Sequence, residues 1–170
     1  MFRVRAVVLT IGLFLGLTAS ASAGTLAELV FETTLGNGLK VLIVEEPKAP
    51  VVAVQVWYKV GSRNEETGRT GLSHMLEHMM FKGTPKVGPK QFVMIVTRNS
   101  GVDNAETQMD FTGYYENFAA DRVELGLMLE ADRMANLLID EKEFEPEHQV
   151  VIEKRRLGST TSPPTSWGRR

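Results

Sequence analysis

The sequence predicts an α+β fold in which helices pack on one face of a mixed, mostly antiparallel sheet. Two β-prone runs flank an Asn-Gly turn near the start, two more lie close together near the middle, and segments with helical periodicity occupy most of the rest. Neighbouring runs of this kind pair locally, which favours an α+β arrangement over alternating βαβ units. A length of 170 residues corresponds to one domain or to part of a longer protein.

The first predicted β element is a hairpin. Residues 31–35 and 39–44 are β-prone and flank Gly36-Asn37-Gly38, where Asn-Gly supplies the positive φ angles of a tight turn. Residues 51–60, VVAVQVWYKV, form a longer run that is apolar at nearly every position. Because such runs are typical of strands buried on both faces, we expect an inner strand here.

The rest of the chain is predicted to be mainly helical. Apolar periodicity and Gly/Pro breaks predict helices at residues 71–80, 90–98, 120–138 and 141–157, with strands at 102–107 and 111–118. The third helix is expected to be amphipathic, with one apolar stripe formed by Val123, Leu127, Ala131, Met134 and Leu138.

Residues 1–23 have the composition of a secretory signal peptide. Arg3 and Arg5 precede an apolar run, and Ala21-Ser22-Ala23 forms a cleavage site before Gly24. A membrane anchor is the alternative, but the uncharged run is shorter than the ~20 residues that span a bilayer. We therefore expect an exported chain, periplasmic or secreted in a bacterium, with no stable membrane anchor.

The mature chain is expected to form one partial N-terminal domain over residues 24–157. Residues 158–170, GSTTSPPTSWGRR, contain no acidic residue and two adjacent prolines, which predicts a disordered tail. A domain that passes from a charged helix into such a segment suggests truncation, and a shifted reading frame near Leu157 is one hypothesis.

Composition excludes several classes of function. The net charge is −2, which disfavours nucleic acid as a partner because phosphate binding needs a basic surface. The chain has no cysteine, so any metal must be bound by His, Asp or Glu. Of the three histidines, His148 is isolated in a charged segment and is expected to lie on the surface, which leaves His74 and His78.

His74, Glu77 and His78 form an HxxEH pattern on the predicted helix at 71–80. Imidazoles at i and i+4 lie one above the other on a helix, and the carboxylate at i+3 shares their face. Two imidazoles on one turn suit a tetrahedral zinc ion, and a neighbouring glutamate suits the role of general base. An accidental grouping on a solvated helix face is the alternative, but the scarcity of histidine in this chain disfavours it.

The stretch from Gly71 to Thr84, GLSHMLEHMMFKGT, resembles the pitrilysin, insulin-degrading enzyme and mitochondrial processing peptidase family of zinc peptidases, especially its short bacterial members. The resemblance extends from Phe31 to about Leu157. Its other matching stretches are Asn37-Gly38-Leu39 with Val41, Val60-Gly61-Ser62-Arg63-Asn64-Glu65, Asp103-Asn104-Ala105 with Thr107, and Glu130-Ala131-Asp132-Arg133-Met134.

This resemblance implies a zinc endopeptidase in which His74 and His78 hold Zn²⁺ and Glu77 is the general base and later the proton donor. It also implies that the strand carrying Asn104 and Ala105 is the edge to which an extended peptide or protein substrate adds. Family members are built from related half-units, so this chain corresponds to an incomplete half-unit whose partner is a second half-unit or a homologous subunit.

The chain departs from the family at the third zinc ligand. The resemblance implies a glutamate seven residues after Glu147, but that position is Lys154. Glu153 and Glu147 remain alternative ligands, although Glu153 points about 100° away around the helix.

Three functional hypotheses therefore remain. The first is a zinc metalloendopeptidase N-terminal domain, and the second is a non-catalytic homologue that binds peptide or a partner subunit. The third is a truncated or frame-shifted product with no independent role.

Overall fold

The computed structural model describes residues 30–161. They fall into two compact units divided between Pro47 and Lys48, and each unit is described by itself. The predicted signal peptide at residues 1–23 lies outside the described residues. Among the described helices, none combines the length and the apolar character needed to cross a bilayer.

The first unit contains the predicted hairpin. Strand β1 (Val30–Thr34) pairs antiparallel with β2 (Lys40–Val44). Gly38 adopts a φ of 87°, and the backbone N–H of Leu39 donates to Asn37 Oδ1 over 3.1 Å. The turn forms where predicted, but only Gly38 takes a positive φ, whereas Asn37 contributes through its side-chain oxygen.

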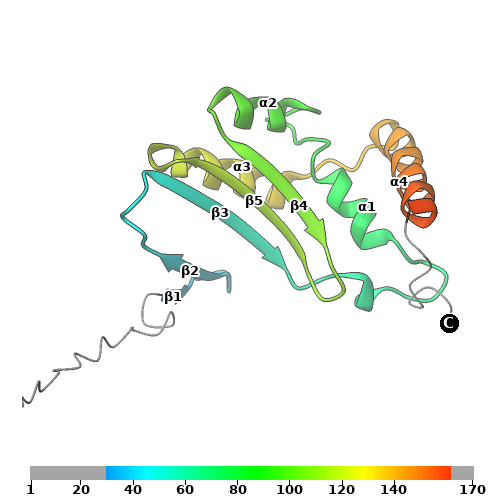
Figure 1. The fold of residues 1–170 in the computed structure, drawn as a ribbon, viewed down its shortest axis with the longest axis horizontal. Helices are drawn as coiled ribbons and strands as arrows, with labels where there is room; N and C mark the ends of the chain where they lie inside the picture. Colours follow the sequence, from blue (N-terminus) through cyan, green and yellow to red (C-terminus); the bar gives the residue numbers. More distant parts are fainter. Residues whose placement is uncertain (1–29, 162–170) are drawn as a thin grey trace, which may run out of the picture. The chain divides into compact units, whose positions relative to one another are not determined.

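The second unit contains a three-stranded antiparallel sheet in the order β3-β5-β4 (Figure 1). Its strands are β3 (Val51–Tyr58), β4 (Val102–Thr107) and β5 (Thr112–Ala119). All pairings are between antiparallel neighbours, as Val54 with Glu116 and Ala105 with Tyr114. The central strand is therefore β5, and β4 lies at an edge.

The prediction of an inner strand at residues 51–60 is wrong. Within the described residues β3 pairs with β5 alone, and burial alternates along it: Val54 is buried, whereas Gln55 and Trp57 are exposed. The uninterrupted apolar run reflects the high β propensity of Val, Trp and Tyr, and it does not report burial on a second face.

Four helices accompany the sheet, and their bounds are α1 (Leu72–Met79), α2 (Gln91–Arg98), α3 (Val123–Asn136) and α4 (Glu141–Thr161). Helix α3 contacts β3 and β5, while α1 contacts β4 and β5. Alternate residues of β5 (Tyr114, Glu116 and Phe118) are buried, but Asn117 between them is exposed. The helices therefore cover one face of the sheet, which confirms the predicted fold class.

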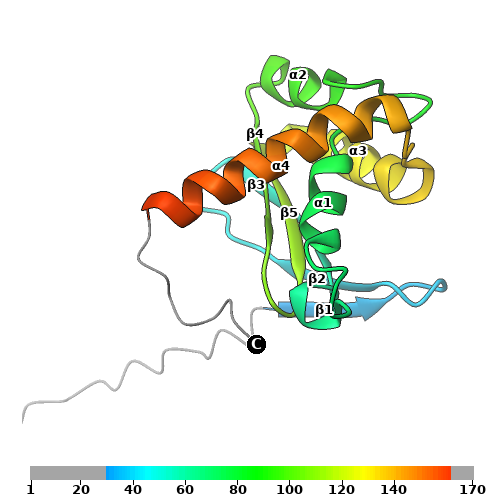
Figure 2. The same cartoon turned by 90° about the vertical axis from the view of Figure 1, so that its right-hand side faces the viewer.

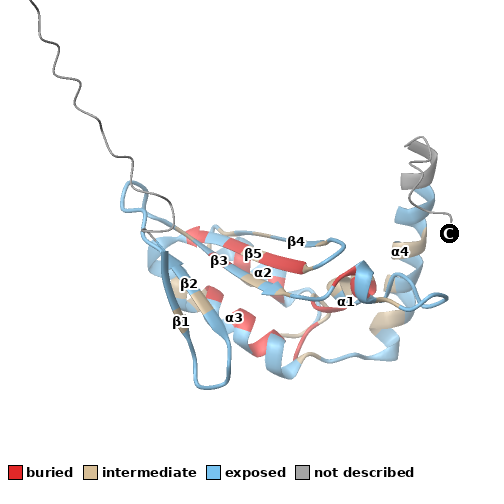
Figure 3. Cartoon of the chain, turned by 90° about the horizontal axis from the view of Figure 1, so that it is seen from below, coloured by how far each residue is buried: buried red, intermediate tan, exposed pale blue. Residues whose placement is uncertain are grey.

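The core lies between this face and the helices. Buried residues concentrate in α1, α3 and β5 (Figure 3). Phe92 and Val96 from α2 pack with Phe118 of β5 and Leu129 of α3 in one apolar cluster. Gly126 lets α3 approach closely, because an added Cβ would lie 2.9 Å from Val54 Cγ2.

The predicted apolar stripe of the third helix is on the wrong face. Leu127 and Met134 are 56% and 42% exposed, and Ala131 and Leu138 are also exposed. The buried face of α3 instead carries Gly126, Leu129, Glu130 and Arg133. The sequence pattern failed here because this face is buried through charged side chains that bond to one another.

Arg133 is the centre of this buried charged group. Its guanidinium donates to Glu130 Oε2 over 2.9 Å and to Glu116 Oε1 over 3.1 Å, and it lies 4.4 Å from the ring centroids of both Phe92 and Tyr114. Burial and a hydrogen bond with Glu130 raise the pKa of Glu116 to about 9, so this carboxyl retains its proton at neutral pH.

Helix α4 continues to Thr161, four residues beyond the predicted end at Leu157. Residues 158–161 of the predicted tail are thus helical, and residues 162–170 lie outside the described part of the chain. Figures 1 and 2 show α4 alongside α1, with which it makes contact.

The proton on Glu116 predicts a pH-dependent stability. The folded chain keeps this proton up to about pH 9, whereas the unfolded chain releases it near the ordinary carboxyl pKa of 4.5. The resulting stabilisation is complete below the lower value and is lost as pH rises through the higher one. Urea unfolding across this window should show a smaller pH-dependent loss of unfolding free energy in Glu116→Gln than in wild type.

The matched control is Glu124→Gln, which changes an exposed glutamate on α3. It should retain the wild-type pH profile. Parallel profiles for wild type and Glu116→Gln would contradict a native-state proton on Glu116.

Candidate metal centre

The candidate site lies on α1, and the N-terminus of this helix is capped from a preceding loop. Gly71 precedes α1 with a φ of 97°, and the helix has no Ser, Thr, Asp or Asn cap of its own. The carboxylate of Glu65 takes that role from a distance, accepting the backbone N–H of Gly71 over 2.7 Å and that of Ser73 over 2.8 Å. Burial raises the pKa of Glu65, but these hydrogen bonds outweigh it and hold the pKa below its ordinary value.

The two faces of α1 differ in burial. Met75 and Met79 are buried, while His74, Glu77 and His78 lie together on the half-buried face. This is the helical arrangement that the HxxEH spacing predicts. The ligand atoms of the three site residues all lie within 4.8 Å of one another, and they are the metal-capable cluster among the described residues.

The two imidazoles converge through their Nε2 atoms. His74 Nε2 and His78 Nε2 are 3.2 Å apart, and the rings are inclined by 82°. Two nitrogens bound to one tetrahedral zinc ion at about 2.05 Å would be about 3.3 Å apart. The spacing of the two Nε2 atoms therefore matches that of two imidazole ligands of one such ion.

Glu147 from α4 orients His78. Its Oε1 lies 2.5 Å from His78 Nδ1, and its Oε2 forms an ion pair with the ammonium of Lys82. Burial raises the pKa of Glu147, but its bonds to Lys82 and His78 outweigh this and lower the pKa, so the group is a carboxylate. A carboxylate at Nδ1 places the ring proton there and leaves the Nε2 lone pair available to a cation.

His74 is held in its neutral form. Burial lowers the pKa of His74, the neighbouring His78 lowers it further, and the opposing attraction of Glu77 is weaker. A neutral imidazole at neutral pH is the form that binds a metal.

Glu77 is tied to the sheet. The Thr107 hydroxyl at the end of β4 donates to Glu77 Oε2, which leaves Oε1 without that donor. This hydrogen bond holds the Glu77 carboxylate beside the imidazoles.

Where the family resemblance implies a third zinc ligand, α4 carries a cationic side chain instead. Lys154 Nζ lies 3.4 Å from His78 Nε2. Glu153, one of the two alternative ligands, is paired with Arg156 and its side chain is 58% exposed. Glu147, the other alternative, is engaged at Nδ1 of His78, on the far side of the ring from Nε2. Neither belongs to the metal-capable cluster of the described residues.

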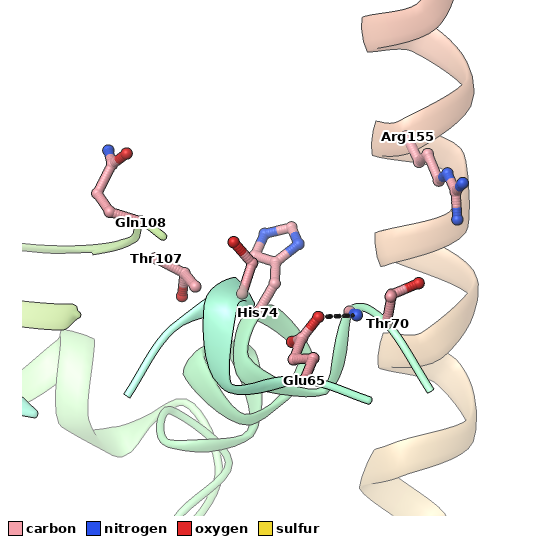
Figure 4. Close-up of a pocket in the computed structure, with 8 residues that line it drawn as sticks. Glu65, Thr70, His74, Thr107, Gln108 and Arg155 are labelled. Atoms are coloured by element: carbon pink, nitrogen blue, oxygen red, sulfur yellow. Dashed lines mark hydrogen bonds between the residues drawn. The ribbon is translucent and has the colours of Figure 1, made fainter. Parts of the chain in front are cut away.

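A pocket of about 430 Å³ opens beside His74. In Figure 4, Thr107 and Gln108 lie on one side of His74 and Arg155 of α4 lies on the other. Its remaining lining residues, which come from the segment before α1 and its start, are Ser62, Glu65, Thr70 and Gly71. The pocket gives a ligand access to the His74 ring.

The predicted substrate residues lie on the edge strand. Asn104 and Ala105 belong to β4, which contacts α1 on the face that carries the site. Asn104 Oδ1 accepts the backbone N–H of Ala105 over 2.9 Å. His148, in contrast, is exposed and stacks on Phe144, as expected of a surface histidine.

Sequence reasoning gave no role to Glu65, Lys82 or Thr107. All three act on site residues across loops or from other elements, so no short spacing pattern could indicate them. The only signal was that each lies in a stretch that carries the family resemblance.

Comparison with known proteins gives a consistent result. Residues 40–162 match the family model for Insulinase (Peptidase family M16). The chain is 46% identical over 131 residues to a zinc protease, PqqE, of Helicobacter pylori, covering 76% of this chain and 30% of the relative. It is 30% identical over 141 residues to the mitochondrial-processing peptidase subunit beta of Lentinula edodes, covering 83% of this chain and 30% of the relative.

Solved structures agree with the described fold. A protease from Helicobacter pylori superposes with a TM-score of 0.76 at 44% identity, covering 79% of this chain and 32% of the other. Pitrilysin superposes with a TM-score of 0.70 at 28% identity, covering 76% of this chain and 14% of the other. The chain thus spans about a third or less of the length of these proteins.

Removing the Glu65 carboxylate, which caps the N-terminus of α1, should destabilise this helix. Glu65→Ala leaves the N–H groups of Gly71 and Ser73 without their acceptor, and loss of such a cap costs about 1–2 kcal/mol. Urea unfolding should show this decrease in Glu65→Ala but little change in the control Glu66→Ala, an exposed neighbour. Equal effects of the two substitutions would show that Glu65 does not anchor the helix.

Proposed function

Because the chain belongs to the insulinase family, peptidase family M16, we propose that it is the metal-binding and peptide-binding N-terminal part of a zinc metalloendopeptidase. The observation that carries this proposal is the convergence of two imidazole Nε2 atoms at 3.2 Å beside the Glu77 carboxylate. A solvated helix face has no reason to hold two half-buried histidines in this orientation, or to supply a carboxylate partner for one of them.

His74 and His78 would hold the zinc ion. When bound, zinc would supply Lewis-acid polarisation of a peptide carbonyl and would favour ionisation of water. Glu77 would accept the proton of the attacking water and return it to the leaving amine. Thr107 would keep the carboxylate in place through Oε2, so that Oε1 is the oxygen that carries the proton.

An extended peptide would bind along β4. Within the described residues this strand pairs with β5 alone, so its other edge presents backbone groups to a ligand strand. The Asn104 side chain covers the N–H of Ala105, and a bound peptide would replace that local hydrogen bond. Recognition of this type depends mainly on backbone conformation, which suits extended or unfolded segments.

The complete activity would need a second half-unit. The chain spans about 30% of the length of the curated relatives, and one of these relatives is by name a subunit. We expect the missing groups, including donors that stabilise the developing oxyanion, to come from a further domain or a homologous partner. Residues 1–23 support export to the periplasm or the medium as part of this proposal.

A second candidate is a non-catalytic homologue that binds peptide or a partner subunit. The contact of Lys154 Nζ with His78 Nε2 favours it, because a cation stands where a third metal ligand would be needed. The two candidates share the peptide-binding edge at β4 and differ in whether Glu77 performs chemistry.

Glu77→Gln distinguishes the candidates. The expected result is loss of cleavage of an unstructured fluorogenic peptide by about 100-fold or more, because glutamine cannot accept a proton. Zinc binding should persist, since both imidazoles remain. The measurement is peptide cleavage with added zinc by the chain from Gly24 combined with its second half-unit, beside Glu124→Gln as an exposed control.

Unchanged cleavage in Glu77→Gln would refute its role as the base. Binding of the peptide without cleavage by the wild-type chain combined with its second half-unit would favour the non-catalytic homologue.

A further inference from the structure

The ammonium group of Lys154 contacts the imidazole pair at His78. Lys154 Nζ is 3.4 Å from His78 Nε2, and the Nδ1 atom of the same ring faces the Glu147 carboxylate at 2.5 Å. In the neutral ring, a proton on Nδ1 that is donated to Glu147 leaves Nε2 with a lone pair that accepts from Lys154. This is the lone pair through which His78 would bind a metal.

The position of Lys154 follows from the face that α4 presents to α1. Lys154 lies seven residues after Glu147, which is two turns of an α-helix, so both side chains are on the same face. Lys82 binds the other oxygen of Glu147. The alternating series Lys82, Glu147, His78 and Lys154 therefore links the two helices through charge-assisted hydrogen bonds.

The arrangement of the two imidazoles also requires a proton or a cation at one of the Nε2 atoms. If Nε2 of each neutral ring carried a lone pair, two acceptors would face one another across 3.2 Å and repel. A proton on His74 Nε2, a metal ion or an ammonium group relieves this repulsion. The group that the described chain itself places there is Lys154.

A divalent ion and this ammonium cannot share the site without a large penalty. An ion on Nε2 would lie within a few ångströms of Nζ, where the two like charges repel each other. Lys154 is exposed and has a flexible four-carbon stem, so it is able to turn into solvent.

We propose that Lys154 is a built-in competitor of the metal: its ammonium and zinc exclude one another at His78 Nε2. This inference rests on the proposed function, because it takes the imidazole pair as the zinc site. In the metal-free chain Lys154 holds α4 against α1, and zinc binds only as Lys154 leaves. The consequence is a zinc affinity lower than the convergent imidazoles alone would give.

The test is zinc affinity, measured by competition with a chromophoric chelator on the full chain. Lys154→Met removes the competing charge and should tighten zinc binding about tenfold, and Lys154→Glu adds a carboxylate and should tighten it about 100-fold. Lys142→Glu makes the same charge change on an exposed lysine of α4 and should leave the affinity within about twofold of wild type. His74→Ala in the Lys154→Glu background should abolish the gain.

A second readout is the coupling of Lys154 to Glu147. In chelator-treated protein, shifts of the urea midpoint for Lys154→Met and Glu147→Gln should be non-additive, because both groups act through the His78 ring. Additive shifts would contradict the bridge.

Each zinc result has a distinct meaning. Equal zinc affinities for wild type, Lys154→Met and Lys154→Glu would overturn the competition while leaving the proposed zinc site intact. A lack of zinc binding in every variant, including Lys154→Glu, would overturn both the competition and the metal-binding part of the proposed function.

Discussion

The contact between His78 and Glu147 is the interaction on which the site depends. The two residues are 69 positions apart in sequence, and their bond joins α1 to α4. It decides which nitrogen of His78 carries the proton, and therefore which lone pair a cation meets. Because Lys82 holds the second oxygen of Glu147, the carboxylate is fixed from two directions and the ring has little freedom to rotate. Without this contact His74 and His78 would still share a helix face, but their Nε2 atoms would not be held toward one another.

The sheet contributes the rest of the geometry. The buried group around Arg133 pins α3 to β5, and Gly126 lets the helix approach closely enough for that burial. Replacement of such a group by apolar residues often leaves stability unchanged, so its value lies in fixing one arrangement of helix and strand. With β5 fixed, β4 places Thr107 against Glu77 and keeps its edge beside α1. The Glu77 carboxylate and the proposed peptide edge are thus positioned by the same strand.

Local patterns in the sequence predicted the elements and the zinc-capable cluster. The Asn-Gly hairpin, the four helices and the HxxEH face depend on neighbours within a few residues, and each appears where expected.

Two predictions failed for one reason. The apolar run of β3 and the apolar stripe of α3 were both interpreted as burial, although burial depends on distant partners. Arg133, which no hydrophobic pattern marks, is among the most buried side chains of the described residues because two carboxyl groups and three rings surround it. The roles of Glu65 and Lys82 could not be predicted, since the loop and the helix that bring them to the site are tertiary features.

The central claim is that Glu147 holds His78 with its proton on Nδ1, so that a cation binds at Nε2. A long-range ¹⁵N–¹H correlation spectrum of the histidine rings in the metal-free chain tests it most directly. We expect a protonated Nδ1 and an unprotonated Nε2 for His78, with the Nε2 resonance shifting when zinc is added. A neutral His78 ring protonated at Nε2, or an Nε2 resonance insensitive to zinc, would contradict the account.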